Sequence, residues 1–317
     1  MQLKNKKALV IGGAGFIGSH IISELIKRNC KVTVIDDFSN GRMENIQQNL
    51  DNITLIKDSV TNSKLVRDNI DVDVIFHEAA LNLLRSVQSP SKDLLVNAGG
   101  TLNILEAMRE TKSNAVLVYA STGSIYGEPE YNPQDEKHPC HPTSPYGISK
   151  LAAEQYVNWF AKEYGLKTIA LRYYNVFGSR QEYSDMGGVV PIFIKRMLKG
   201  LPPIIEGDGT QSRCFTYIDD VTRANILAYE KCKRFGKAYN IGTTEITTIQ
   251  QLADIVCSMR SDITLKPEYT KPRIGDVHDF GPDISKAKQY LDYSPKWRLK
   301  DALPHVMDWM KCELDSL

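Results

Sequence analysis

Residues 8–18 read ALVIGGAGFIG, four apolar residues followed by a glycine-rich segment that leads into a helical pattern. The glycines fit both G-x-G-x-x-G, at Gly13, Gly15 and Gly18, and G-x-x-G-x-x-G, which begins at Gly12. Glycine at such positions permits a tight turn, close approach of the backbone to a pyrophosphate, and close packing of helix on strand. The following helix directs its free N–H groups and positive dipole end at the phosphates. The segment therefore predicts a strand–turn–helix that binds a dinucleotide.

An acidic pair follows the next predicted strand. Asp36 and Asp37 lie about 20 residues beyond the glycines, where a carboxylate accepts hydrogen bonds from both hydroxyls of a ribose. A carboxylate there also repels a 2′-phosphate, so the sequence favours NAD over NADP. The alternative is a tight turn with a solvated aspartate pair.

Apolar strands alternate with amphipathic helices through the first half of the chain. This alternation indicates βαβ units and a parallel sheet covered on both faces. We expect an α/β fold, a Rossmann-type doubly wound parallel sheet with a smaller α/β lobe that binds the substrate. The predicted strands are 8–11, 31–35, 53–57, 72–77, 115–120 and 167–172, and the predicted helices are 16–28, 91–110 and 145–164.

Beyond Gly178, glycines and prolines separate shorter elements. Residues 239–242 (YNIG) have the pattern of a strand that returns to the main sheet. We therefore expect a cofactor domain at 1–178, joined by 217–247, and a substrate lobe at 179–317. Helices are predicted at 189–199, 219–232, 248–259 and 300–311.

The bulk composition excludes several classes of protein. The 317 residues are 42% hydrophobic, with 39 basic and 38 acidic residues, so a core is expected and nucleic acid is not an expected partner. No stretch reaches the ~18 apolar residues of a membrane span, and no signal peptide is recognisable. The six cysteines form no C-x-x-C pair, so we expect no metal site and reduced thiols in a cytoplasmic protein.

The sequence Tyr146-Gly147-Ile148-Ser149-Lys150 has the pattern Y-x-x-x-K, and Pro145 suits the first turn of a helix. Residues i and i+4 share one helix face, so the phenol and the ammonium can share a site. A nearby ammonium and a positive nicotinamide would favour the phenolate, which makes Tyr146 a candidate general base for a sugar hydroxyl. The alternative is a surface Tyr–Lys pair.

These motifs resemble, over nearly the whole chain, the extended short-chain dehydrogenase/reductases of the nucleotide-sugar epimerase and dehydratase group. Several motifs in one order are more specific than any single motif. Beyond the glycine loop and Y-x-x-x-K, the matching segments are 76–80 (FHEAA), 97–106 (NAGGTLNILE), 121–127 (STGSIYG), 172–178 (RYYNVFG), 207–209 (GDG) with Arg213, 217–221 (YIDDV) and 273–276 (RIGD).

The resemblance implies a role for each matching residue. Thr122 would hydrogen-bond the reacting hydroxyl, beside Tyr146 and Lys150. The residues expected to bind NAD are Gly12, Gly15, Phe16, Ile17, Gly18, Asp36, Asp37, Asp58, Ala79, Ala80, Asn97, Tyr146, Lys150 and Tyr173. The residues expected to bind the nucleotide sugar are Ser124, Asn175, Val189, Arg213, Arg273 and Asp276.

The residues after Thr122 bear on the reaction. The usual 4,6-dehydratases of this group carry Asp and Glu directly after the catalytic Thr, whereas Gly123 and Ser124 stand here. Because neither is an acid, we expect UDP-hexose 4-epimerisation through a 4-keto sugar. Dehydration at C5 and C6 of a sugar such as UDP-GlcNAc, 4,6 or 5,6, stays the alternative, and a non-catalytic NAD-binding protein is a more distant one.

Several features leave the sugar and the nucleotide base open. The loop Leu81–Ser86 is about one residue shorter than in similar epimerases, and Phe280 stands where those enzymes carry a residue that limits sugar size. Glu78 and Glu182 are unassigned carboxylates for which surface positions are expected. A homodimer formed through helices 91–110 and 145–164 is also expected. Leu151, Tyr156, Trp159 and Phe160 either supply its apolar surface or pack inward.

Overall fold

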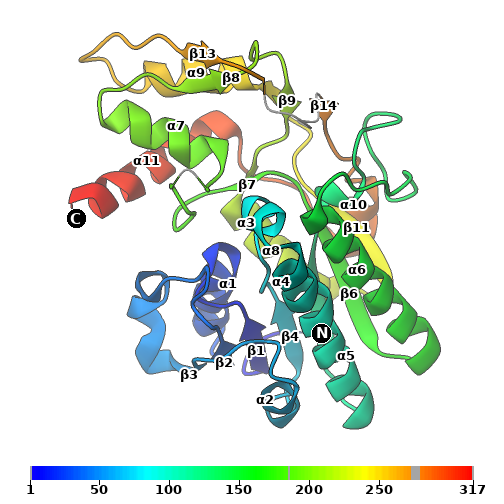
Figure 1. Ribbon diagram of the computed structural model, residues 1–317. Helices are drawn as coiled ribbons and strands as arrows, with labels where there is room; N and C mark the ends of the chain where they lie inside the picture. Colours follow the sequence, from blue (N-terminus) through cyan, green and yellow to red (C-terminus); the bar gives the residue numbers. More distant parts are fainter. Residues whose placement is uncertain (1, 185, 273–278, 316–317) are drawn as a thin grey trace.

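A single parallel sheet of seven strands forms the centre of the computed structural model, which describes residues 2–184, 186–272 and 279–315 (Figure 1). Its strand order is β11-β6-β5-β4-β1-β2-β3. This order confirms the expected α/β fold with a doubly wound sheet, and β11 is the strand predicted to return from the second half of the chain. The strands are β1 (Lys7–Ile11), β2 (Lys31–Ile35), β3 (Ile53–Ile56), β4 (Val74–His77), β5 (Val116–Thr122), β6 (Lys167–Tyr173) and β11 (Lys237–Ile241).

Helices cover both faces of this sheet. Successive side chains of a strand point to opposite faces, so Ala8 and Val10 join one buried cluster while Leu9 and Ile11 join the other. The first cluster includes α1 (Phe16–Lys27), α8 (Ile218–Lys231) and α10 (Ser285–Leu291). The second includes α2 (Ser63–Asp68), α5 (Gly100–Glu110) and α6 (Pro145–Tyr164). Helix α10 contacts α8 and β11, so the chain comes back to the main sheet a second time. The sequence did not predict this second return.

The helix expected at 91–110 is divided into three parts. It consists of α4 (Pro90–Leu94), a π-helical turn (Leu95–Gly99) and α5. Asn97 lies inside the π-helical turn, and its side chain is fully buried. A π-helical turn often accompanies a functional site, because it redirects one side chain without ending the helix.

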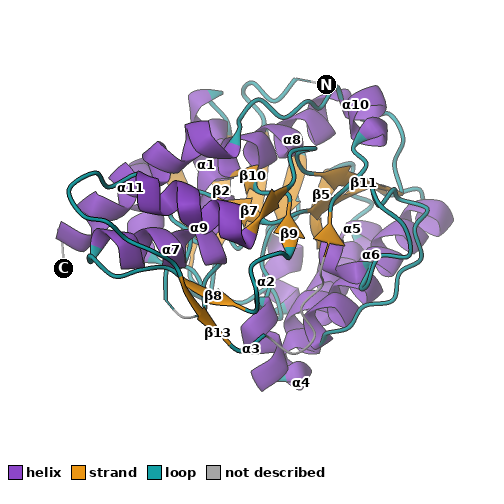
Figure 2. Ribbon diagram, turned by 90° about the horizontal axis from the view of Figure 1, so that it is seen from above, coloured by secondary structure: helices purple, strands orange, loops and turns teal. Residues whose placement is uncertain are grey.

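A third buried cluster is formed largely by elements from the second half of the chain, which lie at the top of Figure 1. Figure 2 shows these elements from above, with α7 and α9 beside α11. They include the helices α7 (Val189–Leu198), α9 (Ile249–Ser258) and α11 (Leu299–Asp315). The short strands of this part of the chain are β8 (Ile204–Glu206), β9 (Ser212–Arg213), β12 (Thr247–Thr248), β13 (Glu268–Thr270) and β14 (Asp279–Phe280), and β7 (Val176–Phe177) pairs with β10 (Thr216–Tyr217) beside the main sheet.

Candidate active site

The cofactor pocket lies at the carboxyl ends of β1 and β4, where the direction of strand addition reverses. Open α/β sheets bind ligands at this switch point. Gly12 has a φ of +80°, and a Cβ there would lie 2.4 Å from the Ala79 nitrogen, so only glycine fits. The α1 helix begins after Gly15 without a capping side chain or an acid in its first turn, which leaves its N–H groups free for phosphate. These features fit a dinucleotide.

Seven of the 14 expected cofactor residues line this pocket. They are Gly12, Gly15, Asp36, Asp37, Asp58, Ala79 and Ala80. Asp36 accepts hydrogen bonds from the Ala14 and Phe38 N–H groups, both at 2.8 Å, and burial raises the pKa of its carboxyl. Asp36 therefore fixes the glycine loop to the end of β2 in addition to facing the pocket. Phe16, Ile17 and Gly18 form the first turn of α1 beside it.

The short segment Leu81–Ser86 is not a plain loop. Residues Leu83–Gln88 form helix α3, because the Asn82 side chain caps it by accepting the Arg85 N–H. The Arg85 guanidinium donates to the Ser39 carbonyl at 2.8 Å and to Glu182 at 3.3 Å. Arg85 thus ties the loop after β2, which borders the cofactor pocket, to α3 and to the segment after β7. Glu182 has the surface position expected for it, with its side chain 35% exposed.

Asn97 and Tyr173 are bonded within the protein. Asn97 accepts the Leu81 N–H at 3.0 Å, and its amide nitrogen donates to Asp93 and to Ser149. It therefore joins the segment after β4 to α4 and α6. The Tyr173 hydroxyl hydrogen-bonds to Asn225 and donates to Glu78 at 3.1 Å.

Thr122 at the end of β5 interacts with Tyr146 at the start of α6, and Lys150 follows on the same helix. Thr122 ends β5 and caps the short helical turn Gly123–Ile125, accepting the Ser124 N–H at 3.1 Å. Tyr146 and Lys150 lie one turn apart on α6, which begins at Pro145 after the capping side chain of Ser144. The Lys150 ammonium is buried and stands 4.4 Å from the centre of the Tyr119 ring.

Burial shifts the pKa values of both titratable side chains in this group. Burial raises the pKa of Tyr146 to about 12, and the Thr122 hydroxyl opposes that rise. Burial lowers the pKa of Lys150 to about 8. The charges of Asp93 and Glu78 raise the Tyr146 pKa further. The expected phenolate depends on the Lys150 ammonium together with a bound nicotinamide, and it stays a prediction. Tyr146 needs positive charge from the bound cofactor to become a base near neutral pH.

Glu78 is the site residue that sequence reasoning misplaced. The expected surface position is wrong: Glu78 lines the cofactor pocket, and burial raises the pKa of its carboxyl to about 7. The Lys150 ammonium and the Tyr173 hydrogen bond oppose that rise. Its place directly after the buried strand β4, within FHEAA, was the one signal available in the sequence.

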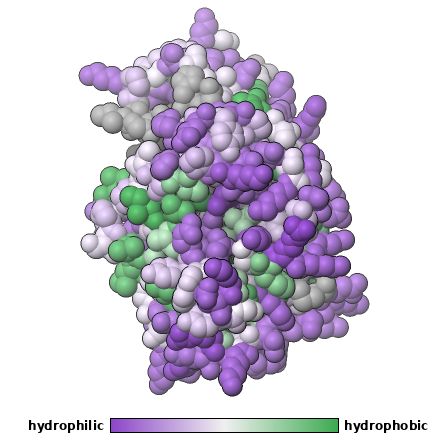
Figure 3. All heavy atoms as spheres, turned by 90° about the vertical axis from the view of Figure 1, so that its right-hand side faces the viewer, coloured by the Kyte–Doolittle hydropathy of each residue, from purple (hydrophilic) through white to green (hydrophobic). Residues whose placement is uncertain are grey.

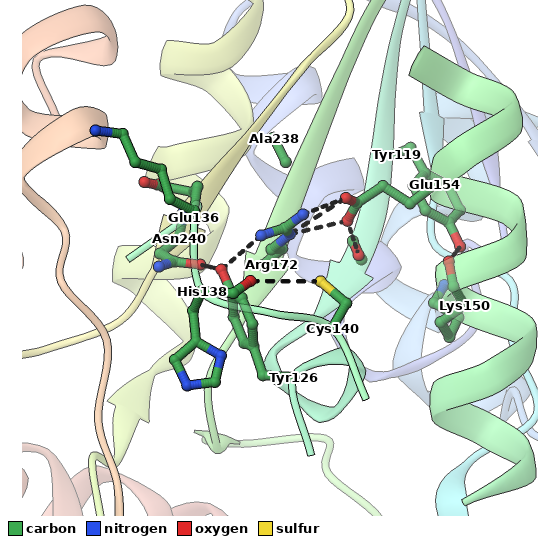
Figure 4. Close-up of polar contacts among 12 residues, drawn as sticks. Tyr119, Tyr126, Glu136, His138, Cys140, Lys150, Glu154, Arg172, Ala238 and Asn240 are labelled. Atoms are coloured by element: carbon green, nitrogen blue, oxygen red, sulfur yellow. Dashed lines mark hydrogen bonds and ion pairs between the residues drawn. The ribbon is translucent and has the colours of Figure 1, made fainter. Parts of the chain in front are cut away.

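A buried polar network lies next to Lys150 and joins side chains of α6, β5 and β6 (Figure 4). Glu154 follows Lys150 by one helical turn and pairs with Arg172 of β6 at 2.5 Å. The same carboxylate accepts a hydrogen bond from Ser121 at 2.5 Å, and Arg172 donates to the Tyr126 hydroxyl at 2.6 Å. Because Ser121 precedes Thr122 and Arg172 precedes Tyr173, this network ties β5, β6 and α6 together.

The residues expected to bind the sugar are only partly described. Ser124 stands next to Thr122 and accepts its hydroxyl at 3.2 Å, while Val189 begins α7. The Asn175 amide nitrogen is buried and finds no hydrogen-bond partner among the described residues. Arg213 lies in β9, close in sequence to Thr216, whose N–H donates to the Asn175 carbonyl. Arg273, Asp276 and the side chain of Phe280 lie outside the described part of the chain.

Within residues 2–184, 186–272 and 279–315, no three His, Cys, Asp or Glu side chains gather as metal ligands. All six cysteines are free thiols. No helix of the described chain is long and apolar enough to cross a membrane.

Comparison with known proteins is consistent with this geometry. Residues 8–242 match the model of the NAD dependent epimerase/dehydratase family. The chain belongs to this family. It is an NAD-dependent enzyme, since the family, the dinucleotide pocket and the Thr122, Tyr146 and Lys150 group agree.

Three relatives cover almost the whole chain. A putative UDP-glucose 4-epimerase of Methanocaldococcus jannaschii is 41% identical and covers 96% of this chain and 98% of its own. The UDP-glucose 4-epimerase of Thermotoga maritima, solved with UDP-glucose, is 38% identical with a TM-score of 0.91, covering 97% and 99%. A UDP-N-acetylglucosamine 4-epimerase of Methanobrevibacter ruminantium is 34% identical with a TM-score of 0.92, covering 98% and 99%. Nucleotide-sugar decarboxylases and a 4,6-dehydratase are also related.

Proposed function

We propose that the chain is a UDP-hexose 4-epimerase that retains NAD through turnover. The proposal is supported by the interaction of Thr122 with Tyr146, by Lys150 one turn along the same helix, and by Gly123 and Ser124 after the threonine. Glu78, which lines the dinucleotide pocket, acts on the charge of Lys150. The 4-epimerase relatives support the same reaction. The sugar differs among those relatives, so the proposal extends to the hexose class and not to one sugar.

Each side chain of the group has a different role at C4 of the sugar. Bound NAD supplies the hydride acceptor and, later, the hydride donor. Tyr146 takes the proton of the C4 hydroxyl and returns it to the C4 oxygen after the 4-keto sugar has presented its other face to the cofactor. Thr122 holds that oxygen by a hydrogen bond. Lys150 provides the positive charge that favours the Tyr146 phenolate once the site is loaded. Asn175 and Arg213 would bind the diphosphate. The diphosphate has to stay bound while the 4-keto sugar rotates in the site.

The surroundings of Thr122 support epimerisation over 4,6-dehydration. A 4,6-dehydratase has to remove the C5 proton and protonate the departing C6 hydroxyl, which requires acid–base groups on the sugar side. Ser124 is engaged with Thr122, and Gly123 carries no side chain. Glu78, whose charge acts on both Tyr146 and Lys150, borders the cofactor pocket instead.

Product analysis tests the proposal. The protein with its bound cofactor is incubated with UDP-glucose, UDP-GlcNAc and UDP-glucuronate, and the products are followed by NMR. We expect interconversion of C4 epimers with at least one of these sugars. A product lighter by one water would replace epimerisation with dehydration, and loss of carbon dioxide from UDP-glucuronate would replace it with decarboxylation.

We also propose a cytoplasmic homodimer formed through α3, α4 and α6. Hydrophobic side chains gather on one part of the face shown in Figure 3. Tyr156 and Trp159 are 43% and 47% exposed, whereas Phe160 is buried and Leu151 is partly buried, so only two of the four expected residues face outward. The exposed apolar side chains of these elements and the π-helical turn are Leu83, Val87, Leu94, Leu95, Ile148, Tyr156 and Trp159.

Charge on this surface would separate the two copies. Ile148→Glu should convert the dimer to a monomer in light scattering at micromolar concentration, because it places a charge in the apolar contact. Ile246→Glu changes an equally exposed isoleucine of the other lobe and should leave the mass unchanged. A parent protein that is already a monomer would remove the dimer proposal.

A further inference from the structure

The carboxyl of Glu78 is held at the junction of the cofactor pocket and the reactive group. Its backbone N–H donates to the Ile11 carbonyl at 2.8 Å, which fixes the residue at the switch point between β1 and β4. Its side chain accepts the Tyr173 hydroxyl from β6, 95 positions along the chain, and the residue lines the pocket with Gly12 and Ala79. A carboxyl placed in this way is not a solvated surface group.

Hydrogen bonds connect Glu78 to Tyr173 and Tyr173 to Asn225. The Asn225 amide nitrogen of α8 donates to the Tyr173 hydroxyl at 2.8 Å, and that hydroxyl donates to Glu78. The same hydroxyl also lies 3.0 Å from the Asn225 amide oxygen, a second acceptor, and its hydrogen bond to Glu78 favours the ionised carboxyl. The Glu78 carboxyl is therefore a fixed acceptor, and when ionised it is a fixed negative charge.

Several other groups share the electrostatic environment of Glu78. Lys150 carries the opposing charge, and Glu78 is the first of three carboxylates that favour the ammonium form of Lys150. The ionised carboxyl also disfavours the phenolate of Tyr146. The titratable groups on the surrounding elements are Lys150 and Tyr146 on α6, Tyr173 on β6, Tyr119 on β5, Asp93 on α4 and His77 on β4.

We propose that Glu78 is a positioning residue that orients Tyr173 and places a negative charge beside the cofactor pocket, favouring the oxidised, positively charged nicotinamide over the reduced form. A negative charge stabilises a positive ring and leaves a neutral ring unaffected. The same charge keeps Lys150 protonated and restrains deprotonation of Tyr146. Glu78 thereby sets both the cofactor preference and the pH range of the site.

Competition between the two cofactor forms tests the first part without any sugar. The protein with its bound cofactor is equilibrated with mixtures of NAD+ and NADH, and the bound fraction of each is measured after separation. Glu78→Gln keeps an acceptor for Tyr173 and removes the charge, so the bound ratio should move toward NADH by about tenfold, the order expected for one charge several ångströms away. Glu163→Gln, an exposed carboxylate at the end of α6, should leave the ratio unchanged.

The pH profile tests the second part, which rests on the proposed function. Loss of the charge lowers the pKa of both Tyr146 and Lys150, so both limbs of the activity profile of Glu78→Gln should move to lower pH. If the maximal activity of Glu78→Gln falls while both limbs of its pH profile stay at the parent positions, Glu78 has only a structural role. A bound NAD+/NADH ratio within about twofold of the parent would overturn the cofactor part, whether or not any sugar is turned over. Glu78→Met provides the same comparison if the glutamine variant does not fold.

Discussion

Replacement of Glu154 by glutamine should destabilise the protein strongly, because it leaves the Arg172 guanidinium buried without a counter-charge. The Glu154 side chain is fully buried and the Arg172 side chain is 7% exposed. Glu154 accepts the guanidinium through both of its oxygens, with distances from 2.5 to 3.2 Å, and it also accepts Ser121. Breaking one side of a buried pair costs about 3–5 kcal/mol.

The geometry places Glu154→Gln at the lower end of this range. Glutamine retains one oxygen for Ser121 or Arg172 but supplies no charge, so we expect a loss of about 3 kcal/mol. For a chain of this size that loss lowers Tm by about 6 °C. Glu163→Gln, which changes an exposed carboxylate of the same helix, should stay within about 0.5 kcal/mol of the parent.

A double-mutant cycle separates the ion pair from general damage to the core. Arg172→Met removes the charge that Glu154→Gln leaves behind, so the double variant should be more stable than the sum of the two single losses by about 2 kcal/mol. Denaturant unfolding followed by intrinsic fluorescence measures each variant. Additive losses, or a Glu154→Gln variant within about 1 kcal/mol of the parent, would refute the reasoning, because the buried guanidinium would then not depend on its partner.

Three further predictions concern the site directly. Tyr146→Phe should lower kcat by about 10²–10⁴-fold while the purified protein retains NAD, since only the proton transfer is lost; a variant of near-parent rate would remove Tyr146 as the base. Gly12→Ala should abolish retention of NAD in gel filtration, because the new Cβ meets the backbone of the segment after β4. Gly165→Ala has a similar positive φ, with no atom within 4 Å of its Cβ, so it should keep the cofactor and lose only about 1–2 kcal/mol of stability. Arg85→Ala should release NAD several-fold faster in a cofactor-exchange assay, because the loop after β2 loses its tie to α3, whereas Arg109→Ala on the outer side of α5 should exchange at the parent rate.

Local features of the site could be predicted from the sequence because each is encoded within one short segment. The glycine loop, the aspartates after β2 and the Y-x-x-x-K helix each depend on a turn, a strand end or a helical period. Helix α6 was predicted with both ends correct, because Ser144 and Pro145 mark its start and Gly165, with a φ of +70°, its end.

Other features depend on segments that are distant in sequence. Helix α3 has a local cap at Asn82, but its Arg85 contacts Ser39 and Glu182, which are 46 and 97 positions away. The π-helical turn follows from the inward contacts of Asn97 with Leu81, Asp93 and Ser149, the last of them 52 positions away. Such contacts leave no periodic signal in the sequence around them.

The sequence by itself determined the α/β fold and the dinucleotide loop, because these rest on residue type and local spacing. Spacing also made Tyr146 and Lys150 candidates, and the family resemblance added Thr122. Only the tertiary structure decided their electrostatic state. Burial raises the Tyr146 pKa and lowers the Lys150 pKa. The fold also places Glu78 between the cofactor pocket and Tyr173. Desolvation depends on how much of the whole chain surrounds a group, and a linear pattern does not contain that quantity.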